Sequence, residues 1–127
     1  MGITIISEDG RFEWNKDKSL LNRKKHGFSF AEILEVFDDP AFLEGYDFEH
    51  SVKEERYYGI GRINNILYII VFYTYPKKST PKDEESDSWV RESEPSYIHE
   101  RRRIFSARQA DREEQEDYDE YFKKIKS

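Results

Sequence analysis

The chain has 127 residues, of which 38% are charged and 16% aromatic, and its formal net charge is -6. This length predicts one domain with a single modest core. The absence of cysteine excludes disulfides, thiolate nucleophiles and cysteine-bound zinc. No apolar run approaches the ~20 residues that cross a bilayer, so we expect a cytoplasmic protein without a membrane partner.

The charges are segregated along the chain. Residues 16–26 and 99–108 are rich in Lys and Arg, whereas 83–94 and 111–120 are dominated by Asp and Glu. The two basic segments form one cationic patch if the fold brings them together.

The first predicted elements are a short strand and a helix. Residues 11–14 (RFEW) have the pattern of an edge strand, and Asn15 offers a side-chain oxygen that caps a helix through about His26. Gly27 supplies the left-handed residue that commonly follows a helix. The basic segment 16–26 is therefore expected to be helical.

A second helix is predicted to follow at once. Ser29 and Glu32 form a capping box at its start, and Pro40 ends it. Its apolar residues recur at helical spacing and form one buried face: Phe30, Ile33, Leu34 and Phe37.

Strand patterns occupy the middle of the chain. Residues 41–47 and 55–63 predict two strands, and Asn64-Asn65 is expected to form a two-residue hairpin turn because asparagine tolerates positive φ. Residues 66–75 (ILYIIVFYTY) are apolar almost throughout, which is typical of a central strand covered on both faces.

The last third begins with a polar, acidic stretch at 76–96, which is expected to be a flexible insertion. A strand is predicted over 97–105, and Asp111 with Glu114 forms the capping box of a final helix. That helix has an apolar stripe: Tyr118, Tyr121, Phe122 and Ile125. The order β-α-α-β-β-β-β-α predicts an α+β fold over 1–127, in which two N-terminal helices and a C-terminal helix pack on a small antiparallel sheet.

Five short motifs in register resemble the BrnT toxins. They are KHGFSF at 25–30, EVFDDP at 35–40, EER at 54–56, the Ile-Gly pair at 60–61 and RIFSAR at 103–108. The resemblance implies a bacterial toxin of a type II toxin-antitoxin system, with a RelE-like fold and endoribonuclease activity. It also implies a BrnA-like antitoxin that assembles with the toxin as a heterotetramer and alone brings it to operator DNA.

RNA cleavage without metal or cofactor proceeds by attack of the ribose 2′-OH on the adjacent phosphate. It needs a proton acceptor, a proton donor and cations around the phosphorane. With the resemblance, this chemistry selects His26 as base or acid and Arg56, Arg103 and Arg108 as a phosphate clamp. The other interpretation of His26 is a helix end that complements the dipole.

Further candidates surround this set. Glu54 or Glu55 is a candidate base or an orienting group for the histidine, although acids at a strand start also keep an edge soluble. Lys24 and Lys25 add positive charge for RNA binding, but their side chains point to different sides of a helix. Tyr73 is a candidate stacking platform for a base or, alternatively, part of the core.

Alternation along the last strand separates its arginines. Arg101 and Arg103 are expected on an exposed cationic face, where Arg101 binds RNA, while Arg102 lies on the other face with Ile104. Three consecutive arginines are also compatible with an ordinary solvated edge.

A second function remains open, namely a non-catalytic module that binds a BrnA-like antitoxin without cleaving RNA. The net charge, the acidic stretch 83–94 and Gln109, where lysine is common in the resembled family, favour it.

Overall fold

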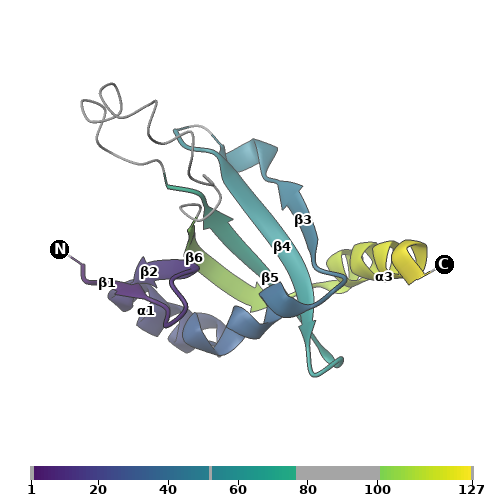
Figure 1. Cartoon of the computed structure of the whole chain (residues 1–127), viewed down its shortest axis with the longest axis horizontal. Helices are drawn as coiled ribbons and strands as arrows, with labels where there is room; N and C mark the ends of the chain where they lie inside the picture. Colours follow the sequence, from purple (N-terminus) through teal and green to yellow (C-terminus); the bar gives the residue numbers. More distant parts are fainter. Residues whose placement is uncertain (1, 52, 77–100, 127) are drawn as a thin grey trace, which may run out of the picture.

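The computed structural model describes residues 2–51, 53–76 and 101–126 (Figure 1). Its elements, in chain order, are β1 (Thr4–Ile6), β2 (Phe12–Asn15), α1 (Lys16–His26), the 3-10 helix η1 (Ala31–Asp38), β3 (Leu43–Tyr46), the 3-10 helix η2 (Phe48–His50), β4 (Arg56–Ile63), β5 (Leu67–Thr74), β6 (Arg102–Gln109) and α3 (Arg112–Lys126). Except for Pro76, the predicted insertion 76–96 lies outside the described residues.

The strands form one six-stranded sheet in the order β1-β2-β6-β5-β4-β3. The α+β class is confirmed, but the sheet is mixed rather than antiparallel, because β2 runs parallel to β6. The predicted edge strand 11–14 corresponds to β2 and lies inside the sheet, since the unpredicted β1 pairs with its outer side. Three residues in β1 are too few to produce a periodic signal.

The first helix ends as predicted at both termini. Asn15 Oδ1 accepts a hydrogen bond from the Lys18 amide at 2.9 Å. Gly27 adopts φ 88 and donates its amide to the Arg23 carbonyl at 2.9 Å. Both caps act within four residues, so sequence alone was sufficient to find them.

The second predicted α-helix is instead the 3-10 helix η1. The capping box forms, with the Ser29 amide donating to Glu32 Oε1 at 2.8 Å and the Glu32 amide to Ser29 Oγ at 3.3 Å. The buried residues of this region recur every third position: Phe30, Ile33 and Val36. This spacing places them on one side of a 3-10 helix, so packing against the sheet favours the tighter helix.

The strand predictions over 41–47, 55–63 and 66–75 are confirmed by β3, β4 and β5. The β4–β5 turn has three residues rather than two, because Ile63 pairs directly with Leu67. Asn64 and Asn65 adopt positive φ as expected. The predicted strand 97–105 is shifted: β6 begins at Arg102 and continues to Gln109, while 97–100 lies outside the described residues.

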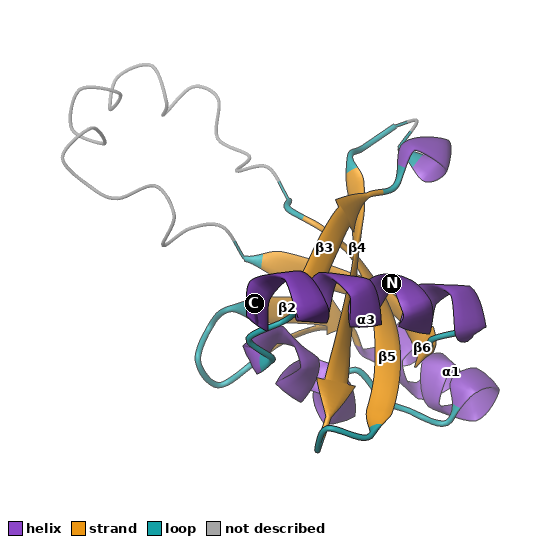
Figure 2. Ribbon diagram, turned by 90° about the vertical axis from the view of Figure 1, so that its right-hand side faces the viewer, coloured by secondary structure: helices purple, strands orange, loops and turns teal. Residues whose placement is uncertain are grey.

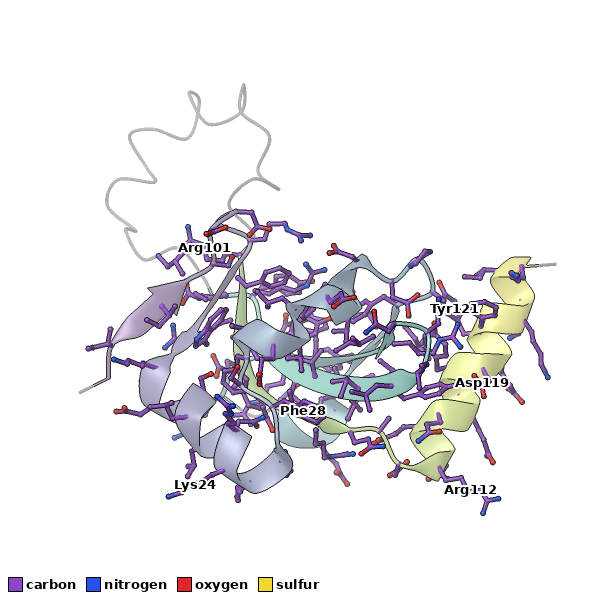
Figure 3. The ribbon with its side chains drawn as sticks, turned by 90° about the horizontal axis from the view of Figure 1, so that it is seen from below. Lys24, Phe28, Arg101, Arg112, Asp119 and Tyr121 are labelled. Atoms are coloured by element: carbon purple, nitrogen blue, oxygen red, sulfur yellow. The ribbon has the colours of Figure 1, made fainter. Side chains whose placement is uncertain are left out.

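The central strand β5 contributes to a core on each face of the sheet. Ile69, Val71 and Tyr73 pack with η1 residues on one face, whereas Ile70 packs with Tyr118 of α3 on the other. Figure 2 shows α3 crossing in front of the strands, and Figure 3 shows the sheet between α1 and α3. The C-terminal helix therefore covers only part of its face and leaves the rest for a site.

Candidate active site

The pairing register of three strands brings the predicted arginines onto one face of the sheet. Thr74 of β5 pairs with Arg56 on one side and with Arg103 on the other, and Ile70, four residues earlier, pairs with Arg108. Because side chains alternate along a strand, Thr74 and Ile70 share a face with all three arginines. This is the face on which α3 packs.

A β-bulge makes this arrangement possible. Arg103 and Arg108 are five positions apart, so regular alternation would direct them to opposite faces. The register shifts between Phe72 and Tyr73, which pair with Ser106 and Ile104 and leave one extra residue in β6. This extra residue returns both arginines to one face, which is a common role of bulges near functional sites.

The extra residue is Phe105, and its ring organises the cations around it. The Arg56 guanidinium lies 4.6 Å from the Phe105 ring centroid. The ring centroids of Phe105 and Phe72 lie 6.3 Å apart, and the Arg108 guanidinium lies 5.7 Å from the Phe72 ring centroid. Arginine and aromatic rings therefore alternate across this surface, which suits both phosphate and base recognition.

The three arginines differ in their partners. Arg103 and Arg101 both bind Glu13 of β2, Arg101 through Nη1 at 3.4 Å. Arg108 makes a bidentate ion pair with Glu114 of α3, in which Nη1 donates to Oε1 and Nη2 donates to Oε2, each at 2.9 Å. The hydrogen bond to Glu114 raises the pKa of Arg108.

Arg56 differs from the other two. Among the described residues no ion pair involves Arg56, and its buried Nε atom has no hydrogen-bond partner. Stacking on Phe105 holds its guanidinium group while leaving donors available for a ligand.

His26 reaches the same surface from the end of α1. A hollow of about 180 Å³ between α1 and β6 is lined by Lys25, His26, Phe105 and Ser106. Phe105 therefore lines the hollow of His26 and also lies beneath the Arg56 guanidinium. The fold thus brings His26 and Arg56, which are distant in sequence, to neighbouring parts of one surface around Phe105.

Asn22 holds the helix in this position. Its Oδ1 accepts the Ala107 amide at 3.1 Å, and its Nδ2 donates to the Ala107 carbonyl at 2.8 Å. Nδ2 also donates to the Phe28 carbonyl at 2.8 Å. Since β2 ends at Asn15, the buried amide of Asn22 replaces the missing strand as the partner of β6.

Three predicted residues lie elsewhere. Tyr73 has no exposed surface and hydrogen-bonds Glu44 on the opposite face, so it belongs to the core and is not available for stacking on RNA. Glu55 accepts the Tyr57 hydroxyl at 3.3 Å on that opposite face, away from Arg56. Lys24 lines a different hollow from Lys25.

Arg101, which directly precedes β6, and Arg102 and Arg103 at its start follow the predicted alternation. Arg101 and Arg103 share Glu13, while the Arg102 guanidinium lies on the other face, 5.2 Å from the Phe37 ring centroid. Glu13 and Phe72 also belong to this surface, although neither was a predicted site residue. Strand pairing brings them to the arginines, and no local pattern in the sequence indicates this proximity.

A family model described as the ribonuclease toxin, BrnT, of a type II toxin-antitoxin system matches residues 14–81, more than half of the chain. The chain belongs to the BrnT family. It therefore belongs to a family of ribonuclease toxins of type II toxin-antitoxin systems, and an antitoxin is its partner. The matched range of this BrnT protein includes His26 and Arg56, while Arg103 and Arg108 lie beyond it.

No curated protein matches the chain. In the part of this BrnT chain that the structure describes, no three His, Asp or Glu side chains gather around a possible metal position. None of the described helices is both long and apolar enough to span a bilayer.

Proposed function

We propose that this BrnT toxin is an endoribonuclease that cleaves RNA by attack of a ribose 2′-OH on the adjacent phosphate. The new bond joins the 2′-oxygen to phosphorus, and the bond from phosphorus to the 5′-oxygen breaks. One proton leaves the 2′-OH and another reaches the 5′-oxygen, so the products carry 2′,3′-cyclic phosphate and 5′-OH ends.

One observation supports this assignment above the others: Phe105 lines the hollow of His26 and also lies beneath the guanidinium of Arg56, an arginine for which no ion pair is found among the described residues. Arg56 offers a planar donor fork to a phosphate, and Arg103 and Arg108 surround it with further positive charge. His26 is exposed and lines the hollow that also includes Phe105, and it accepts or donates the proton. Glu55 has no role in this proposal because it faces the opposite side of the sheet.

The partners follow from the family. An antitoxin neutralises the toxin, and we propose that it is BrnA-like and that operator DNA is bound only through it. The pairing of Arg103 with Glu13 and of Arg108 with Glu114 favours a second candidate, a module that binds the antitoxin without cleaving RNA. These carboxylates compete with phosphate for the same guanidinium groups.

RNA cleavage by the purified chain distinguishes the two candidates. We expect cleavage in the presence of EDTA, cyclic phosphate ends by mass spectrometry, and no cleavage of an all-2′-deoxy oligonucleotide. His26→Ala and Arg56→Lys should each reduce the rate at least about 100-fold, because lysine keeps the charge but loses the fork. Arg112→Ala, at a side chain that is 92% exposed on α3, is the matched control and should retain activity.

Intact RNA in all reactions, with normal folding and antitoxin binding, would support the binding module instead. Cleavage of the deoxy oligonucleotide would exclude 2′-OH attack.

A further inference from the structure

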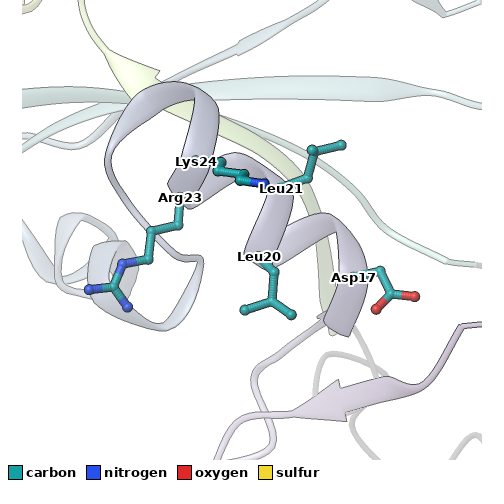
Figure 4. Close-up of a pocket in the computed structure, with 5 residues that line it drawn as sticks. All are labelled: Asp17, Leu20, Leu21, Arg23 and Lys24. Carbon is teal, nitrogen blue, oxygen red and sulfur yellow. The ribbon is translucent and has the colours of Figure 1, made fainter.

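The outer side of α1 carries an apolar surface that the described fold does not cover. Leu20 and Leu21 are each 57% exposed, whereas Ser19 and Asn22 on the inner side are buried against the sheet. Figure 4 shows Leu20 and Leu21 extending from the helix in different directions, and both line one hollow together with Asp17. Two adjacent leucines that are exposed on a highly charged helix do not belong to the core and are accessible to a binding partner.

The rim of this surface is basic although the whole protein is acidic. Arg23 and Lys24 line the same hollow at the last turn of α1, and the helix carries five Lys or Arg residues against one Asp. The chain as a whole has a net charge of -6. A complementary partner therefore presents aliphatic side chains for the leucines and carboxylates for the rim.

This surface adjoins the candidate active site. Leu21 lines both the outer hollow and the hollow that contains His26 and Phe105. A chain segment that covers Leu20 and Leu21 therefore lies beside the entrance to the His26 hollow. Occupation of the outer side of α1 would exclude a bulky RNA strand from that hollow by steric overlap and by neutralising nearby positive charge.

We propose that Leu20, Leu21, Arg23 and Lys24, the α1 docking face, bind an acidic segment of the antitoxin that inserts aliphatic side chains over the two leucines and blocks access to His26. This proposal rests on the proposed function, because the block matters only if His26 acts on RNA. In this proposal the antitoxin neutralises the toxin by covering the entrance to the His26 hollow.

Two other occupants fit the face less well. RNA would gain phosphate contacts from Arg23 and Lys24, but the leucines at the centre offer it no hydrogen bonds. An anionic membrane would attract the charges, yet the helix has only 11 residues and its inner side packs on the sheet. An acidic, partly apolar protein segment uses both the charges and the leucines.

The test measures binding of the protein encoded beside this chain in its operon. Leu20→Glu places a negative charge at the centre of the face and should weaken binding at least tenfold, equivalent to about 1.4 kcal/mol. Ile66→Glu is the matched control, since Ile66 is 77% exposed in the β4–β5 turn, and it should bind as the wild type does. Arg23→Glu should slow association at low salt and have less effect at high salt.

The same variants are then assayed for RNA cleavage with and without that protein. Leu20→Glu should cleave RNA at the wild-type rate alone and resist neutralisation, because Leu20 does not line the His26 hollow. Unchanged binding by both Leu20→Glu and Arg23→Glu would overturn the docking proposal and leave the proposed function intact. Absence of cleavage by the wild type would overturn the proposed function, while the binding comparison would still test the face.

The alternative occupants are measured in parallel. Vesicles of phosphatidylglycerol and a single-stranded RNA are offered to wild type and Leu20→Glu. One result would show that the face serves another partner: vesicles or RNA bind the wild type but not Leu20→Glu, while the operon protein binds both proteins equally. The proposal would then be wrong. Failure of the operon protein to bind wild type would also overturn it.

Discussion

Replacement of Asn22 by alanine is the most informative perturbation of this fold. The side chain is 6% exposed and makes three hydrogen bonds, two to Ala107 and one to the Phe28 carbonyl. Alanine removes all three and leaves backbone groups of β6 without a partner. At about 1 kcal/mol net for each hydrogen bond, and more where a buried group stays unpaired, Asn22→Ala should destabilise the protein by about 2–4 kcal/mol.

Urea unfolding followed by far-UV circular dichroism measures this loss. The dependence of the unfolding free energy on urea should stay the same, because the variant exposes nearly the same surface when it unfolds. Arg23→Ala is the control on the same helix, where the side chain is exposed and the change should stay within about 0.5 kcal/mol. A loss below about 1 kcal/mol in Asn22→Ala would refute the argument that this amide completes the edge of β6.

Two further variants test the packing of α3 and η1. Tyr118→Phe removes the hydroxyl that donates to Asp39 at 2.6 Å and accepts from Arg62 at 3.2 Å, and should destabilise by about 1–3 kcal/mol in urea unfolding. Burial, and then the hydrogen bond to Asp39, raises the pKa of Tyr118 from 10.0 to about 12, so its contribution is complete below pH 10 and declines as the pH rises toward 12. Between pH 10 and 12 the melting temperature should therefore decrease less in Tyr118→Phe than in the wild type. The same decrease in both proteins would contradict this. Gly61→Ala places a methyl group 2.7 Å from the Val36 carbonyl and should lower the melting temperature, whereas an unaltered value would show that η1 moves freely.

Most helix termini and turn conformations were predictable from sequence because they depend on neighbouring residues. Asn15, Gly27 and the Ser29–Glu32 box act within four positions, and the two asparagines at 64–65 take positive φ wherever a tight turn requires it. The box did not reveal the helix type, however. Burial of every third residue in η1 follows from contact with the sheet, which local pattern cannot show.

The candidate site was predictable in part. Motif resemblance indicated His26 and the arginines, but the pattern of 66–75 could not separate a stacking tyrosine from a core tyrosine. Tyr73 is buried because η1 covers its face of the sheet. Glu55 was a candidate because it belongs to the EER motif with Arg56, but it accepts the Tyr57 hydroxyl on the opposite side of the sheet.

The sequence alone therefore determined the α+β class, the capped ends of α1, the capping box at the start of α3, the central position of β5 and the family. The tertiary structure alone decided the parallel pairing of β2 with β6, the carboxylate partners of Arg103 and Arg108, and the bulge at Phe105 that returns these arginines to the face of Arg56. The physical reason is the distance along the chain between the residues that interact. Caps and periodicity depend on interactions within a few residues, whereas register and bulges depend on pairing between strands that are distant along the chain.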